Sequence, residues 1–88
     1  MTLNELIQSI HSLENHLQKF EEKYKIRSED FYILAKGGKL EQDPDFVEWL
    51  GIYEIKLKRQ EKYRQMVSGI LPSLEEEIEL PLAEDISE

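Results

Sequence analysis

Two histidines, His11 and His16, are the only side chains in the 88-residue sequence of the type that exchanges protons near neutral pH. Such a side chain can act as a general base or as a nitrogen ligand to a metal ion. Positions five apart on a helix point about 140° away from each other, so a single helix cannot bring both imidazoles to one metal. We therefore interpret both as solvated histidines at the edge of a helical hairpin.

Acidic side chains gather at two predicted helix starts, Glu29 and Asp30 at one, and Asp43, Asp45 and Glu48 at the other. Clustered carboxylates can hold Mg²⁺ or Ca²⁺, or carry out acid–base chemistry. However, a helix start attracts negative charge in any case, because unpaired backbone N–H groups point out of it. Helix capping is the favoured interpretation, and we predict no metal and no cofactor.

Nucleophilic and phosphate-binding patterns are missing from the sequence. There is no cysteine, and no glycine-rich turn offers backbone N–H groups to an oxyanion. The fragment Gly37-Gly38-Lys39 lacks both a preceding strand and the GxxxxGK[ST] spacing of a phosphate loop. We predict that the protein is not an enzyme.

Charge is spread unevenly along the chain, whose formal net charge is −8, and residues 67–88 carry seven acidic side chains and no basic one. One basic stretch around Tyr63 contains Lys56, Lys58, Arg59, Lys62 and Arg64. It could be a solvated helix face on which Glu54 pairs with Lys58, a dock for an acidic segment such as this chain's own tail, or a nucleic-acid contact. A nearly neutral body with an acidic tail argues against nucleic acid as a direct partner.

The acidic tail alternates charge with apolar side chains, which a purely solubilising tail does not need. Segments of this kind often become ordered on a partner, with apolar residues in pockets and acids against a basic rim. A plain disordered terminus is the alternative. The tail's candidate partner-binding residues are Leu74, Glu75, Glu76, Glu77, Ile78, Leu80 and Leu82.

Two helices are predicted in the first half of the chain. Thr2 and Glu5 have the spacing of a capping box, which starts a helix from about 3 to 25. Its apolar residues follow the heptad pattern of helix-against-helix packing: Leu3, Leu6, Ile10, Leu13, Leu17, Phe20 and Tyr24. A second, shorter helix opens at Ser28, holds Phe31, Leu34 and Ala35 on one face, and ends at Gly37-Gly38.

A third helix is predicted from Asp43, its N-cap, through Pro44 to about Ser68. Between residues 46 and 57 it is apolar almost all round, whereas a surface helix needs only one apolar stripe. A second chain or a partner should therefore cover the other face, and we predict a homo-oligomer or a hetero-complex. The candidate partner-binding residues are Phe46, Trp49, Leu50 and Tyr53, although for Trp49 a place in the core is the favoured interpretation.

These elements predict an all-α fold: a helical hairpin of two long helices with a short connecting helix over residues 1–72, followed by an acidic, partly disordered tail over 73–88. No apolar run approaches the roughly 20 residues that span a bilayer. The first residues lack the basic region of an export signal. We expect a cytoplasmic protein.

Residues 17–60 resemble small antitoxin-like proteins of prokaryotic toxin–antitoxin operons. The matching residues are Phe20-Glu21-Glu22-Lys23-Tyr24, Ser28-Glu29-Asp30-Phe31-Tyr32, Gly38-Lys39-Leu40 and Asp43-Pro44-Asp45-Phe46-Val47-Glu48-Trp49. The chain departs from the family pattern at Lys25-Ile26, where that pattern has a glycine and then a hydrophobic residue. The resemblance implies a protein that neutralises a toxin by direct protein–protein binding, the partner being a basic toxin encoded nearby. A homodimeric structural or adaptor protein is the alternative.

Overall fold

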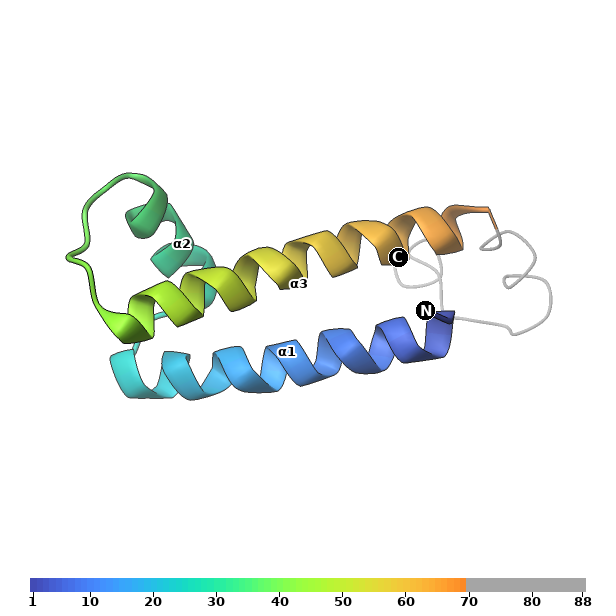
Figure 1. Ribbon diagram of the computed structural model, residues 1–88, viewed down its shortest axis with the longest axis horizontal. Helices are drawn as coiled ribbons and strands as arrows, with labels where there is room; N and C mark the ends of the chain where they lie inside the picture. Colours follow the sequence, from blue (N-terminus) through green and yellow to red (C-terminus); the bar gives the residue numbers. More distant parts are fainter. Residues whose placement is uncertain (70–88) are drawn as a thin grey trace, which may run out of the picture.

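The computed structural model describes residues 1–69. In this part of the chain three helices and no strand are present: α1 (Leu3–Tyr24), α2 (Ser28–Lys36) and α3 (Pro44–Ser68). α1 and α3 lie side by side as a hairpin, and α2 packs near the end where α1 leads into it (Figure 1). The predicted all-α hairpin with a short connecting helix is confirmed. The predicted tail, from residue 73, lies outside the described residues.

The ends of the hairpin differ. The first residues of the chain and the last turn of α3 lie together at one end, which we call the open end (Figure 1). The opposite end, where α2 and the loop after it connect α1 to α3, we call the closed end. None of the helices among residues 1–69 is long and apolar enough to cross a membrane.

The start and the end of α1 are both fixed by local interactions. The Thr2 hydroxyl accepts the Glu5 N–H at 3.1 Å, and the Glu5 carboxylate accepts the Thr2 N–H at 2.9 Å. The predicted capping box is therefore present, and its hydrogen bond to the Thr2 backbone lowers the pKa of Glu5. At the other end Lys25 is the C-cap, with φ 60° and ψ 40°. This left-handed conformation favours glycine, which has no Cβ to clash with the backbone.

α3 begins as the sequence predicts. Asp43 accepts the Asp45 N–H at 2.8 Å, and Pro44 occupies the first turn, where its missing N–H leaves no hydrogen bond unmade. The helix ends at Ser68 with Gly69 as its C-cap. Its 25 residues make it as long as predicted.

α2 begins at Ser28, as the sequence predicts. Ser28 is its first helical residue, Arg27 is the N-cap, and no cap side chain bonds the first turn. The Ser28 N–H instead donates to the carboxylate of Glu21 in α1, at 2.9 Å. A side chain seven residues earlier thus satisfies a helix-start N–H that would otherwise be unpaired.

The core is an aromatic cluster at the closed end. Its buried residues come from all three helices: Leu17, Phe20, Phe31, Trp49 and Tyr53. The predicted seam of α1 faces this core and continues toward the open end through Leu6 and Ile10, which are buried. The heptad pattern is thus satisfied within one chain, by α3 of the same molecule.

Candidate protein-binding surface

Two of the four partner-binding candidates on α3 belong to the core. Trp49 is fully buried, and its ring lies parallel to that of Phe31 with 3.8 Å between centroids. Tyr53 is 7% exposed and packs on Tyr32. Burial raises the pKa of the Tyr53 phenol. For Trp49 the structure shows the favoured interpretation, a core residue. Neither ring is open to a partner while α2 stays in place.

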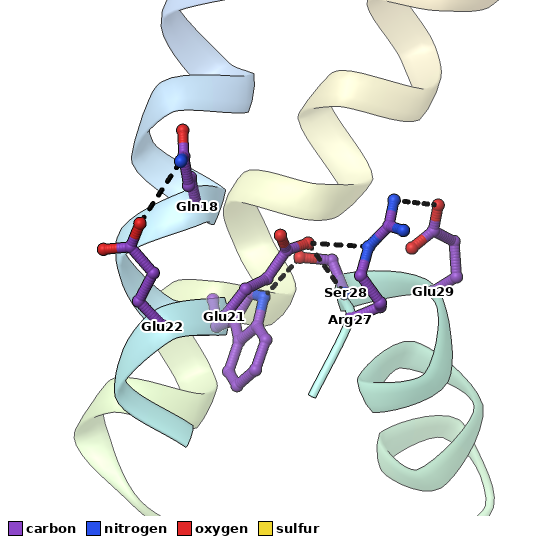
Figure 2. A network of polar contacts seen from close by, with 7 residues as sticks. Gln18, Glu21, Glu22, Arg27, Ser28 and Glu29 are labelled. Atoms are coloured by element: carbon purple, nitrogen blue, oxygen red, sulfur yellow. Dashed lines mark hydrogen bonds and ion pairs between the residues drawn. The ribbon is translucent and has the colours of Figure 1, made fainter. Parts of the chain in front are cut away.

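A polar network holds α2 in that place. The Trp49 indole N–H donates to the Ser28 hydroxyl at 2.9 Å, and Ser28 is itself buried. Figure 2 shows Glu21 reaching from α1 toward Ser28 and Arg27. Arg27 also contacts Glu29, with 3.4 Å between Nη2 and Oε2. One short chain of contacts therefore ties all three helices together beside the aromatic cluster.

The other two candidates, Phe46 and Leu50, are partly buried and line a depression at the closed end. Ala35 and Leu40 complete its apolar side, and Val47 stands at its edge with 61% of its surface exposed. Residues from α2, the following loop and α3 thus form one apolar hollow.

A second depression adjoins the first and shares Leu40 and Phe46 with it. It adds Leu34, which is 36% exposed, whereas Phe31, predicted on the same face of α2, is buried. Because the two hollows share side chains, they form one continuous apolar area. We call it the closed-end surface and define it by Leu34, Leu40, Phe46, Val47 and Leu50.

The closed-end surface has an acidic edge. Glu41 and Asp43 line the same hollow as Phe46 and Leu50. One cation, Lys25, lines the second hollow. The edge nearest Val47 therefore favours a partner with basic side chains around an apolar contact.

Asp45 joins the start of α3 to the end of α1. Its Oδ2 accepts hydrogen bonds from Lys23 Nζ at 2.7 Å and from the Tyr24 hydroxyl at 2.5 Å. The bond from Lys23, followed by that from Tyr24, lowers the pKa of Asp45, and the bonds to Asp45 raise the pKa values of Lys23 and Tyr24. This carboxylate has a structural role in connecting the helices at the closed end.

The other side chains that could carry out chemistry either contact other residues or lie too far apart to act together. Within residues 1–69 no group of three His, Asp or Glu side chains is placed to hold a metal ion. Asp43 caps α3, and Glu29 pairs with Arg27. His16 lies 3.3 Å from the Glu48 carboxylate and stacks on Phe20, while His11 is exposed one turn away.

The basic stretch of α3 makes contacts that the sequence did not predict. Glu54 pairs with Lys36 of α2, with 3.5 Å between Nζ and Oε2, rather than with Lys58. Arg59 donates to the hydroxyl of Ser9 in α1. These longer-range pairs add to the contacts between helices, which spacing along one helix cannot reveal.

The remaining candidates, from Leu74 to Leu82 in the tail, lie outside the described residues. No family model, no curated protein and no solved structure matches this chain. The closed-end surface is accordingly interpreted from its own chemistry.

Proposed function

We propose that this protein is an antitoxin-like inhibitor that binds a basic toxin through the closed-end surface and neutralises it by direct contact. The observation that carries the proposal is an exposed apolar hollow with an acidic edge, built from three segments of the chain. Exposed apolar areas of this kind mark sites of protein association. The proposal assigns the chain no chemistry of its own and places both proteins in the cytoplasm.

Two further facts support the proposal. The residues that resemble antitoxin-like proteins, 17–60, include every residue of the closed-end surface. The chain also carries a net charge of −8, which speeds its encounter with a basic protein. The tail residues from Leu74 to Leu82 remain a predicted second contact with the same partner.

The test is co-expression with the product of an adjacent reading frame that arrests growth by itself. The full chain should restore growth and co-purify with that product. Val47→Ser removes an exposed apolar side chain without opening the core, and it should weaken binding by roughly 2 kcal/mol or more, about 30-fold in Kd. The matched control is Ile55→Ser, because Ile55 is also exposed on α3, at 43%, but lies outside both hollows.

The results separate the two candidate functions. If Val47→Ser and Leu34→Ser both neutralise the toxin as well as the parent chain does, the closed-end surface is not the binding site. If the isolated chain is a stable dimer that Val47→Ser dissociates, and no adjacent product binds it, the homodimeric adaptor is the better account. Light scattering of the parent and the Val47→Ser chains measures this directly.

A further inference from the structure

A second groove runs between α1 and α3 toward the open end. One hollow lies beside Arg27, the residue before α2, and is lined by Leu17 and Lys56. The next lies closer to the open end and is lined by Ile10 and Tyr63. Both hollows include Glu14, so they form one groove. We call it the open groove, and its lining residues include Ile7, Ile10, Glu14, Leu17, Lys56, Gln60 and Tyr63.

The open groove has an apolar floor, and its sides carry charges of both signs: Glu14 and Glu21 from α1, Arg27 before α2, and Lys56 from α3. Ile7, Ile10 and Leu17 come from α1, and Tyr63 comes from α3. Lys56, Gln60 and Tyr63 form the α3 side of the groove, so the one charged side chain there is basic, whereas the α1 side carries Glu14 and Glu21. A segment that filled this groove would therefore need apolar side chains on one face and acids toward α3.

We propose that the open groove is the docking site of this chain's own C-terminal segment, residues 71–82. The sequence of the segment has the required chemistry: Leu74 and Ile78 are four residues apart, the spacing of neighbours on one helix face. Glu75, Glu76 and Glu77 lie between them, and the segment has no basic side chain.

The reach of the chain also fits. α3 ends at the open end (Figure 1), and Tyr63, five residues before its last residue, lines the groove. Residues 69–73 include Gly69 and Pro72, which suit a reversal of chain direction. From Tyr63 back to Lys56 the groove follows seven residues of α3, roughly 10 Å at about 1.5 Å per residue. Leu74 to Leu80 covers a similar length as a helix.

Docking of the segment would regulate the proposed function. The segment carries the predicted tail contacts, Leu74 to Leu82, so a toxin that binds them would first have to displace the segment from the groove. The apparent affinity of the tail for the toxin would fall in proportion to the fraction of molecules with a free segment. The inference uses other residues than the closed-end surface and is measured on the isolated chain, so the two proposals can fail separately.

The test uses the full chain with a nitroxide spin label at Ala83→Cys, a unique attachment point because the sequence has no cysteine. Amide signals of Ile10, Glu14 and Gln60 should lose intensity when the label is active and regain it when the label is reduced. Leu74→Ser with Ile78→Ser should abolish the loss. Leu80→Ser is the control, because position 80 lies about 240° around a helix from position 74.

Charge and stoichiometry complete the experiment. Lys56→Glu should reduce the intensity loss, and so should 1 M salt, which shortens the Debye length from about 10 Å at 0.1 M to about 3 Å. Intensity loss confined to the last turn of α3, or centred on the closed-end surface, would overturn the proposal. A mixed sample is the last control: one chain carries the isotope and no spin label, and the other carries the spin label and no isotope. Intensity loss in that sample would also overturn the proposal, because the segment of a second copy would then fill the groove.

Discussion

The hydrogen bond between Trp49 and Ser28 gives the sharpest test of how α2 is held. Trp49 is fully buried and Ser28 is 1% exposed, so neither polar atom has access to water if its partner is removed. Trp49→Phe keeps a ring against Phe31 but removes the indole N–H. The Ser28 hydroxyl then loses the donor that now lies 2.9 Å away.

The expected cost follows from that burial. Leaving one buried polar group without a partner costs about 1–3 kcal/mol, to which the smaller ring adds the loss of its packing contacts. For a domain of 60–100 residues, each kcal/mol lowers the melting temperature by about 4–8 °C. Trp49→Ala would remove roughly 3–5 kcal/mol, much of a total of about 5–15 kcal/mol, so the phenylalanine variant is the more informative one.

A double-mutant cycle isolates the hydrogen bond. Ser28→Ala alone leaves the buried indole N–H unpaired, and it should cost about 1–3 kcal/mol as well. The double variant removes both partners, so its loss of stability should be smaller than the sum of the two single losses by about 1–3 kcal/mol. Urea unfolding followed by circular dichroism measures all four free energies. Additivity within about 0.5 kcal/mol would refute the assigned role of Ser28.

Three further predictions concern the ends of the helices. Glu21→Ala should lower the free energy of unfolding by about 0.5–2 kcal/mol, the cost of losing a helix cap, as measured by urea unfolding. The control is Glu22→Ala, at the exposed neighbouring position, which should change the free energy of unfolding by no more than about 0.5 kcal/mol. Lys25→Gly should stabilise the chain by about 1 kcal/mol, because glycine adopts φ 60° without the strain of a Cβ, and an unchanged or lower melting temperature would contradict this. The pKa of Asp45 is lowered by its hydrogen bonds, so its contribution to stability is present above the ordinary value of 3.8 and is lost as pH falls through the lowered pKa of the folded state. Asp45→Asn should therefore make the free energy of unfolding less dependent on pH in the acid range. If the variant keeps the pH dependence of the parent chain in acid titrations, Asp45 does not make this contribution.

The helix limits could be predicted from sequence because local chemistry sets them. Thr2 with Glu5, and Asp43 with Pro44, act on backbone groups within three residues, so their spacing alone carries the information. The turn after α1 was beyond such reasoning. Lys25 has no intrinsic preference for a left-handed conformation, and only the packing of α2 against the hairpin requires it there.

For a related reason, the sequence does not show which of the four candidates on α3 lie in the core. Residues 46–57 offer two apolar faces, and the sequence does not say which face α2 covers. Once Ser28, Phe31 and Tyr32 pack on Trp49 and Tyr53, those two rings become core, and Phe46 and Leu50 remain at the edge. Leu40 was overlooked because it lies in a loop, where helical periodicity gives no information.

Phe46 connects the stability of this protein with its proposed binding. Its ring packs on Phe31 and Tyr24 with centroids 5.6 and 5.2 Å away, and the same side chain lines both hollows of the closed-end surface. A substitution there would weaken the core and the surface together, so a loss of binding could not be assigned to either. Val47 is exposed and makes no such aromatic contact, and it reports on the surface alone. The comparison of the two positions decides whether a partner recognises the apolar surface or only a correctly folded closed end.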